Sequence, residues 1–382
     1  MTYPITPREI SIKVLRAPTG DLVEQAWRTS RPADKNVDRE QVMKIDVPVN
    51  EMEDFVLECT TPIIVREMFF SLRDHVAWAR TSRVDDLMNW EVQSGFENDT
   101  EVRACYDMML RLKESQTQDN YREMLPMVYF TTYTVKLSAR TLFKFMAGVL
   151  DWLHNNPVVK DHKPHHLYMM MDMLFRQLMR AKNLSGYRSI PVNQYGKIDL
   201  LPKVKHREPR VDVVGGFVVA YFQSLPIVLR AQIARHRPIT FTDSLHEFLT
   251  ERNVTAPICS RIAIEMSMPT SMALSMVSKR NCWIAQEDLW APVIEAFNET
   301  FGAYGDFLLP CSDKDHCPVG RDNDLRHAGK DPAPACPLWY HFNNLTPDGE
   351  QRAAQMDYMN KRPLSKDWWR EQYMAVTPDP GA

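Results

Sequence analysis

The chain contains one pattern twice, and this repeat constrains its fold more than any other feature of the 382 residues. In residues 55–70, FVLECTTPIIVREMFF, an apolar run of β-type composition ends at Pro62 and a helical run follows. Residues 217–232, FVVAYFQSLPIVLRAQ, have the same arrangement around Pro226. Proline fits the first turn of a helix because the N–H that it lacks would have no intrahelical partner there. Each segment is therefore expected to be a strand that leads directly into a helix.

A second matched pair follows these segments. Residues 122–140 are expected to form the end of a helix, a strand and the start of another helix, and residues 261–279 the same. This places Arg122 and Arg261 at equivalent helix ends, where either could simply complement the helix dipole. Two matches in the same order at comparable spacing favour a duplicated α/β unit over chance similarity between common strand–helix units.

The stretch between the two copies has a different composition. Residues 186–210 are rich in proline, glycine, lysine and arginine, and they interrupt the helical periodicity on either side. The sequence thus predicts a first copy at 1–185, a linker at 186–210, a second copy at 211–305 and a C-terminal extension at 306–382.

Composition excludes several classes of protein. With 44% hydrophobic and 25% charged residues the chain resembles an ordinary globular protein, and its net charge of −3 argues against a surface for duplex nucleic acid. The N-terminus lacks the pattern of a signal peptide, and no apolar run is long enough to span a bilayer. We therefore expect a cytoplasmic protein with no membrane partner. Seven cysteines, an odd number, indicate reduced thiols, and Cys59, Cys105, Cys259 and Cys282 are expected to be buried.

Three neighbouring side chains, Arg235, His236 and Arg237, suggest an anion site, although such a triplet alone is more typical of a solvated turn. Together with Gln232, they resemble the signature of the flavin-dependent thymidylate synthases: Arg-His-Arg, seven residues, then Ser-Gly-Arg-Tyr. Residues 12–15 and 23–30 are similar to that family's N-terminal strand and helix. The resemblance covers most of residues 10–180 and, a second time, residues 210–295.

Each copy departs from the signature where the other keeps it. The second copy has Leu245-His246-Glu247 at the Ser-Gly-Arg position, whereas the first has Ser71-Leu72-Arg73 at the Arg-His-Arg position and Thr81-Ser82-Arg83 at the Ser-Gly-Arg position. The resemblance implies one composite site per chain. It also implies an α/β (α+β) fold of two units, each a mainly antiparallel sheet packed with helices. The cysteine-rich C-terminal extension is an addition that the family lacks. A homodimer would then rebuild the family's tetramer as a pseudo-tetramer.

The resemblance also assigns roles to individual residues. The expected flavin contacts are Arg235, His236, Arg237, Asp243, Ser138 and Arg140. The expected nucleotide contacts are Thr81, Ser82, Arg83, Arg122, Gln232, Arg235 and Asp288. Of these, Asp288, Arg83 and Thr81 are the expected catalytic residues.

The implied activity is transfer of a one-carbon unit from methylenetetrahydrofolate to C5 of a pyrimidine deoxynucleoside monophosphate, with FAD as cofactor and NADPH as its reductant. Where the family has an arginine facing the pyrimidine, the first copy has Val149 and the second has Asp288 or a neighbouring residue. The other interpretation is that the register differs and Asp288 is an exposed helix residue. A carboxylate pairs with the amine of cytosine and repels O4 of uracil, so dCMP is at least as good a candidate as dUMP. The product is a 5-methyl or 5-hydroxymethyl nucleotide. The alternative is a non-catalytic scaffold that binds flavin or nucleotide.

The C-terminal extension contains one further candidate site. Cys311, Cys317, His327 and Cys336 could hold a tetrahedral zinc ion, although they form no Cys-x-x-Cys pair. The other interpretation is that these are reduced cysteines in a loop.

Overall fold

The computed structural model describes residues 3–301, except 32–38, 73–74, 80–87, 116–120, 156–165, 185–186, 188–189, 201–203, 205–207, 235, 237, 239, 246–247, 250–253 and 281–289. The described chain forms two compact units. Unit 1 comprises residues up to 106, 125–204 and 242–260; unit 2 comprises residues 107–124, 205–241 and the described residues from 261 onward.

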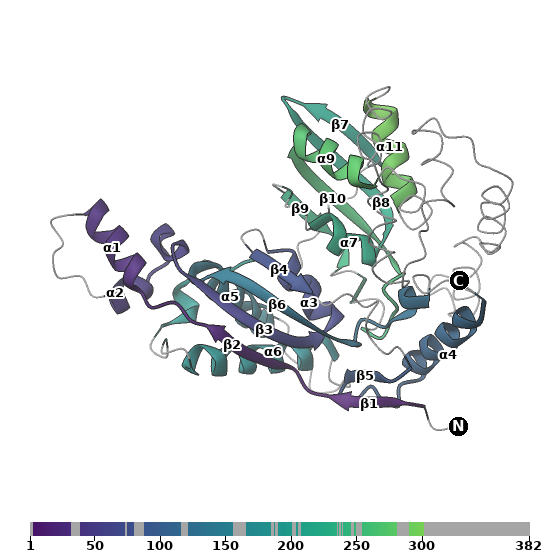
Figure 1. The fold of residues 1–382 in the computed structure, drawn as a ribbon, viewed down its shortest axis with the longest axis horizontal. Coiled ribbons are helices and arrows are strands. Elements are labelled where there is room, and N and C mark those ends of the chain that lie inside the picture. Colours follow the sequence, from purple (N-terminus) through teal and green to yellow (C-terminus); the bar gives the residue numbers. More distant parts are fainter. Residues whose placement is uncertain are drawn as a thin grey trace, which may run out of the picture. The chain divides into compact units, whose positions relative to one another are not determined.

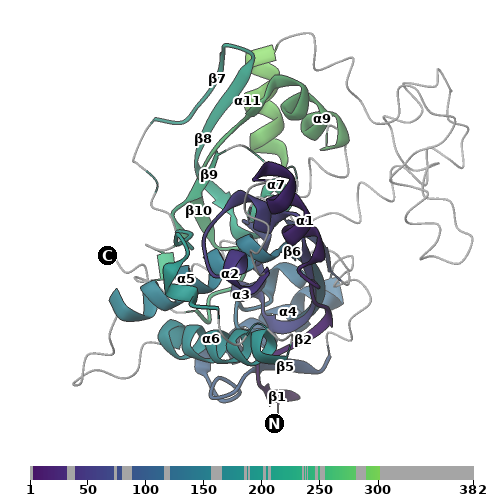
Figure 2. The same cartoon turned by 90° about the vertical axis from the view of Figure 1, so that its left-hand side faces the viewer.

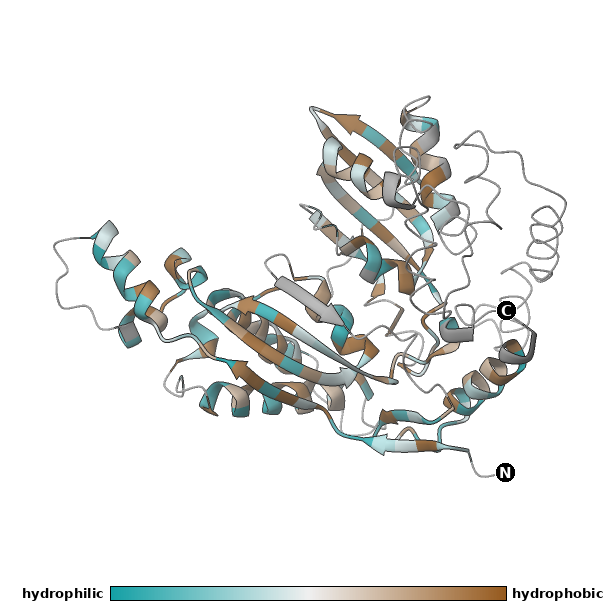
Figure 3. Cartoon of the chain, in the orientation of Figure 1, coloured by the Kyte–Doolittle hydropathy of each residue, from teal (hydrophilic) through white to brown (hydrophobic). Residues whose placement is uncertain are grey.

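The core of unit 1 is a four-stranded sheet in the order β2-β3-β6-β4 (Figure 1). Its strands are β2 (Ser11–Arg16), β3 (Asp54–Pro62), β6 (Phe130–Ser138) and β4 (His75–Ala79), and all three pairs are antiparallel. Along β3 and β6, residues alternate between buried and more exposed, which is the period of a strand with one face in a core. The strands of this sheet carry both apolar and polar residues (Figure 3). The long helices α5 (Ala139–Asn155) and α6 (His166–Leu184) pack against each other and against this sheet (Figures 1 and 2).

The other elements of unit 1 surround this sheet and its helices. They are β1 (Ile5–Arg8) and β5 (Trp90–Gln93), which form a parallel pair, α1 (Asp21–Ser30), α2 (Arg39–Met43), η1 (Pro48–Glu51), α3 (Ile63–Phe70) and η4 (Val192–Gln194). Two further elements, α4 (Thr100–Ser115) and η3 (Tyr121–Met124), lie wholly or partly in residues assigned to unit 2. The strand and helix predicted near the N-terminus are confirmed as β2 and α1.

Unit 2 contains a second four-stranded sheet, in the order β7-β8-β10-β9. Its strands are β7 (Arg210–Val214), β8 (Phe217–Pro226), β10 (Arg261–Pro269) and β9 (Thr240–Asp243), and β8 is antiparallel to both β7 and β10. Gly215 and Gly216 join β7 to β8 with φ of 58° and 81°, as a two-residue hairpin of this kind requires. The helices are α7 (Ile227–Ala234), α9 (Thr270–Arg280) and α11 (Ala291–Phe301). The predicted fold class, antiparallel sheets packed with helices, is confirmed.

The two sheets have the same order of elements. In each, the second strand ends at a proline and leads into an eight-residue helix, α3 after Pro62 and α7 after Pro226. A short strand of the same sheet follows each helix, β4 or β9. The last strand of each sheet along the chain has nine residues and leads into a helix, β6 into α5 and β10 into α9. Between β4 and β6 the chain also forms β5, α4 and η3. Both strand–proline–helix predictions are confirmed.

Two features differ from the sequence prediction. Arg261 does not end a helix: it is the first residue of β10, and its Nη1 donates to the carbonyl oxygen of Ser224 at 3.1 Å. Residues 190–200, which composition assigns to the linker, pack within unit 1, where Ile190, Tyr195 and Leu200 are buried. Proline and glycine interrupt a helix in this segment, but its apolar side chains still reach the core.

The described cysteines and helices agree with the composition. Cys59, Cys105 and Cys259 are free thiols buried in unit 1, as expected, and burial raises the pKa of the Cys59 and Cys105 thiols well above the usual range. Cys282 lies outside the described residues. No helix in the described part of the chain combines the length and apolar character that a bilayer-spanning segment needs.

Candidate functional site

A pocket of about 280 Å³ in unit 1 lies beside the start of α5. It combines two cationic side chains with a carboxylate, two hydroxyl groups and an apolar wall. The lining residues are Glu51, Ser71, Leu72, Arg140, Thr141, Lys144 and Ile198. Ser71 and Leu72 are the residues expected from the sequence at the Arg-His-Arg position of a first copy, and Arg140 belongs to the predicted flavin contacts. The structure thus brings together two sequence positions that the resemblance links to the flavin.

Ser138 fixes where α5 begins. It is the last residue of β6 and is buried, and its Oγ accepts the backbone N–H of Thr141 at 3.1 Å while its own hydroxyl donates to Thr141 Oγ1 at 3.0 Å. A serine that accepts the third N–H of a helix is a typical N-cap. Ser138 therefore anchors the helix turn that carries Arg140.

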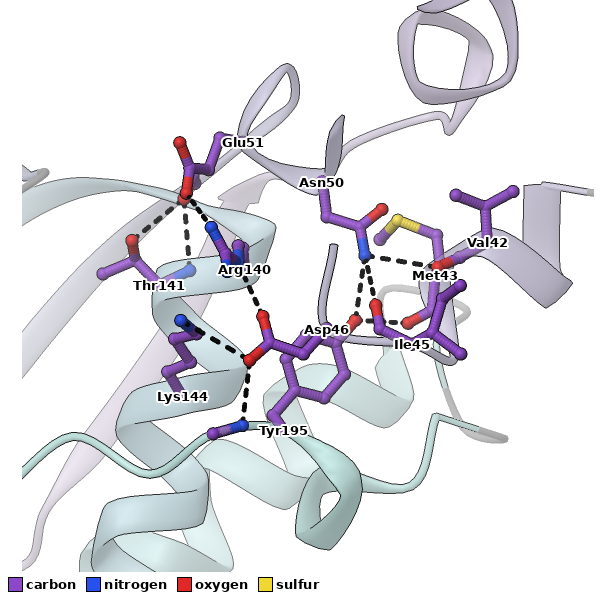
Figure 4. Close-up of polar contacts among 12 residues, drawn as sticks. Val42, Met43, Ile45, Asp46, Asn50, Glu51, Arg140, Thr141, Lys144 and Tyr195 are labelled. Atoms are coloured by element: carbon purple, nitrogen blue, oxygen red, sulfur yellow. Dashed lines mark hydrogen bonds and ion pairs between the residues drawn. The ribbon is translucent and has the colours of Figure 1, made fainter. Parts of the chain in front are cut away.

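Arg140 is held by two carboxylates (Figure 4). Its Nε donates to Asp46 Oδ1 at 2.6 Å and its Nη1 to Glu51 Oε1 at 2.5 Å. The other oxygen of Asp46 accepts the backbone N–H of Gly196 at 3.0 Å and lies 3.5 Å from Lys144 Nζ. Arg140 and Lys144 are four residues apart on α5, so they share a face of the helix. Each cation in the pocket is therefore paired with a carboxylate of the chain itself.

Asp46 and Arg140 are both charged at neutral pH. Burial alone would raise the pKa of Asp46, but the hydrogen bonds from Arg140 and Gly196 and the charges of Lys144 and Arg140 outweigh it, and the pKa lies below its usual value. The hydrogen bond to Asp46 raises the pKa of Arg140. Both groups of the ion pair are therefore ionised.

The loop that carries Asp46 and Glu51 is fixed by Asn50. This side chain is fully buried, and its Nδ2 donates to the carbonyl oxygen of Ile45 at 2.8 Å and to Tyr195 Oη at 3.2 Å. Tyr195 in turn donates to the carbonyl oxygen of Met43 (Figure 4). The carboxylates thus reach the pocket from a rigid support, not from a free surface loop.

The sequence prediction missed most of this cluster. Asp46 is 94 residues from Arg140 along the chain, and Glu51 is 89 residues from it. Charge patterning reveals partners three or four residues apart on one helix, not partners at such separations. The spacing of Arg140 and Lys144 was the only available signal.

Among the motif residues of the second half, Gln232 and His236 are described. Gln232 Oε1 accepts the indole N–H of Trp290 at 2.8 Å, and Trp290 is almost completely buried. The backbone N–H of His236 donates to the carbonyl oxygen of Ile233 at 2.9 Å, in the turn that follows α7. Two residues before Gln232, the fully buried Arg230 lies 5.6 Å over the ring of Phe241. Neither Trp290 nor Arg230 was predicted.

Asp243 and Leu245 are fully buried at and after the end of β9. One oxygen of Asp243 accepts the backbone N–H of Leu245 at 3.0 Å. The side chain of Leu245, at the signature serine position, contributes to a core. This position of the second half is thus an apolar packing position.

The remaining predicted site residues are outside what the structure describes. Arg122 lies in η3, with no description of its side chain. Residues outside the described part of the chain are Thr81, Ser82, Arg83, Arg235, Arg237, Asp288, Cys311, Cys317, His327 and Cys336. In the described ranges, no group of three or more His, Cys, Asp or Glu side chains could hold a metal ion.

No protein-family model matches this sequence, and no curated protein matches it. Among solved structures, the chain is similar to the UMP/dUMP methylase PolB from Streptomyces cacaoi bound with 5-Br UMP, at 14% identity and a TM-score of 0.36, over 50% of this chain and 94% of that chain. The same methylase bound with 5-Br dUMP is 14% identical, with a TM-score of 0.35, over 51% of this chain and 99% of that chain. Thymidylate Synthase X (ThyX) from Helicobacter pylori with FAD and dUMP is 16% identical, with a TM-score of 0.34, over 50% of this chain and 98% of that chain. Each match spans about half of this chain and almost all of the other chain.

Proposed function

We propose that the protein is an FAD-dependent enzyme that transfers a one-carbon unit from methylenetetrahydrofolate to C5 of a pyrimidine deoxynucleoside monophosphate. The observation that carries this proposal is the position of the Arg-His-Arg motif. Residues 235–237 connect α7 to β9, directly after a helix that begins behind Pro226, and Gln232 lies one turn before them. The motif therefore occurs with its strand–helix context and not as an isolated triplet.

The described residues around the motif fit a phosphate-bearing ligand. Gln232 Oε1 accepts the indole N–H of Trp290, and the amide group also has two N–H donors that it can offer to other partners. Donors of this kind suit phosphate and carbonyl oxygens. The guanidinium groups of Arg235 and Arg237 add the forked geometry that favours phosphate. In this proposal these residues bind and orient the ligands, and His236 completes the flavin contacts. Asp243, also a flavin candidate, is fully buried and accepts the N–H of Leu245, so it fits this role less well.

Unit 1 fits the flavin less well. Ser138 and Arg140 are also flavin candidates, but Ser138 is buried as a helix cap and Arg140 is bonded to Asp46 and Glu51.

Tandem duplication is part of the proposal, and a backbone pairing in unit 1 supports it. The N–H of Met127 donates to the carbonyl oxygen of Ala256 at 3.0 Å, and the N–H of Ile258 donates to that of Leu125 at 3.0 Å. The residues between them, Pro126 and Pro257, form an antiparallel bridge. Both prolines lie four positions before the first residue of the corresponding strand, β6 or β10. Equivalent positions of the two copies thus pair reciprocally, as identical segments do across a two-fold axis.

The phosphate-binding part of the proposed nucleotide site comes from the first copy, where Thr81, Ser82, Arg83 and Arg122 would bind the 5′-phosphate. Asp288, from the second copy, would face the base. Bound FAD, kept reduced by NADPH, supplies the hydride for methylation. Overall, methylenetetrahydrofolate, the nucleotide and reduced FAD give the 5-methyl nucleotide, tetrahydrofolate and FAD. Addition of water instead of hydride gives the 5-hydroxymethyl nucleotide. A homodimer would supply four α/β units.

Two measurements on the purified full chain test this function. After FAD is added and unbound FAD is removed, flavin absorbance should remain with the protein. Mass spectrometry should detect a 5-methyl or 5-hydroxymethyl product from dCMP or dUMP with methylenetetrahydrofolate and NADPH. An Arg235→Gln/Arg237→Gln variant should lose flavin, whereas Arg210→Gln on the exposed face of β7 should retain it. Flavin binding without any product would favour the non-catalytic scaffold. A chain that binds neither FAD nor nucleotide would refute both functions.

A further inference from the structure

The pocket beside α5 has the components of an anion site. Arg140 and Lys144 project from the first turns of α5, and the hydroxyl groups of Ser71 and Thr141 lie on the same wall. Guanidinium and ammonium groups next to a helix N-terminus are the usual partners of phosphate. A volume of about 280 Å³ is large enough for a phosphate or pyrophosphate group.

The chain's own carboxylates cancel this positive charge. Asp46 contacts both Arg140 and Lys144, and Glu51 contacts Arg140 from within the pocket lining. Two cations and two carboxylates leave no net charge. A phosphate in the pocket would lie next to Glu51, a group of its own sign, and would compete with Asp46 for Arg140 and Lys144.

Asp46 and Glu51 differ in how strongly they compete with an added anion for Arg140 and Lys144. The side chains of Asp46 and Arg140 are each 20% exposed, whereas that of Glu51 is 46% exposed. Asp46 also receives the N–H of Gly196, so it has three partners, and the buried Asn50 holds its loop in place. Asp46 is therefore the principal competitor and Glu51 the weaker one.

Lys144 is the cation with the most remaining capacity. Its Nζ lies 3.5 Å from Asp46, which is long for a hydrogen bond. An ammonium group has three donors, so Lys144 can contact an added anion more easily than Arg140 can.

We propose that Asp46, assisted by Glu51, is a built-in competitor that closes this pocket to phosphate-bearing ligands, and that its neutralisation uncovers an anion site on Arg140 and Lys144. The inference goes beyond the proposed function, because it requires neither flavin nor nucleotide chemistry. If the proposed function holds, the closed pocket has one consequence. Flavin phosphate then binds only at the Arg-His-Arg motif, which gives one FAD per chain.

The test measures binding of inorganic pyrophosphate to the full chain by titration calorimetry, at low and constant ionic strength. Asp46→Asn should bind pyrophosphate at least about tenfold more tightly than the wild type. Tenfold corresponds to a shift of about one pKa unit, the lower end of the effect that a charge within about 4–6 Å has on an ionisable group. Adding Lys144→Met to Asp46→Asn should cancel the gain. Asp212→Asn, which removes a surface carboxylate paired with Arg210, should leave the affinity unchanged.

Glu51→Gln provides a second variant in case Asp46→Asn fails to fold, and circular dichroism checks both. It should give a smaller gain, because Glu51 is more exposed. Equal pyrophosphate affinity in the wild type and in every folded variant would overturn the proposal, as would a gain that persists without Lys144. Because this titration contains no flavin or nucleotide, its failure is separate from failure of the proposed function.

Discussion

Replacing Gly148 by alanine should destabilise unit 1, although alanine normally stabilises a helix. Gly148 lies in α5, and a Cβ atom built there would lie 2.2 Å from the carbonyl oxygen of Ile198 and 3.3 Å from its carbonyl carbon. The obstacle is backbone, so no side-chain rotation relieves it. Helix α5 and the segment that contains Ile198 must separate by roughly 1 Å or more to restore an ordinary van der Waals contact.

Opposing contributions determine the size of the effect. Overpacking against a rigid neighbour costs about 3 kcal/mol at the upper end of its usual range. The higher helix propensity of alanine returns about 1 kcal/mol. We therefore expect Gly148→Ala to lower the free energy of unfolding by roughly 2 kcal/mol.

Urea unfolding followed by tryptophan fluorescence measures this change. Met169→Ala, at a 44% exposed position on α6, is the matched control for placing alanine in a helix and should change stability little. Hydrogen exchange gives a local reading, because the N–H of Ile198 donates to the carbonyl oxygen of Lys144 at 3.2 Å and should lose protection in Gly148→Ala. An unchanged or higher unfolding midpoint would refute the close approach of α5 to this segment.

Three further predictions concern polar contacts. The folded-state pKa of Asp46 lies below the ordinary 3.8, so Asp46 stabilises the fold above that pH and loses this contribution as the pH falls through the folded value. The difference in stability between wild type and Asp46→Asn, measured in thermal melts at a series of pH values, should therefore be constant near neutrality and shrink below about pH 4. A difference that grows on acidification would contradict the ion pair with Arg140. Ser138→Ala should cost about 1 kcal/mol in urea unfolding and Ser138→Gly only a few tenths, and equal losses would argue against the cap. Trp290→Phe should cost about 1 kcal/mol by removing the indole N–H, and a double-mutant cycle with Gln232→Leu should show coupling, whereas strict additivity would exclude their hydrogen bond.

Local sequence patterns predicted the repeated elements of the fold. Pro62 and Pro226 each mark the change from strand to helix, because proline restricts its own φ and needs no hydrogen-bond partner at a first helical turn. The buried cysteines followed from their apolar neighbours in the same way. These predictions succeeded because the determining interactions lie within a few residues.

Patterns that compete with one another were less informative. Arg261 was expected to end a helix because it was matched with Arg122, but the alternating apolar residues that follow it form β10. Composition assigned residues 190–200 to a linker, although Tyr195 and its neighbours are buried against unit 1. Proline and glycine in a segment show that it is not a helix, not that it lacks tertiary contacts.

The sequence by itself determined the strand–proline–helix repeat, the antiparallel character of the two sheets through the family resemblance, and the Arg-His-Arg motif with its helix. Only the tertiary structure decided that Asp46 and Glu51 form ion pairs with Arg140. It also decided that residues 254–258 belong to unit 1, where Pro257 pairs with Pro126. The physical reason is range. Backbone preference and periodicity act between neighbouring residues, whereas an ion pair between side chains 94 positions apart exists only after the chain has closed the intervening loops.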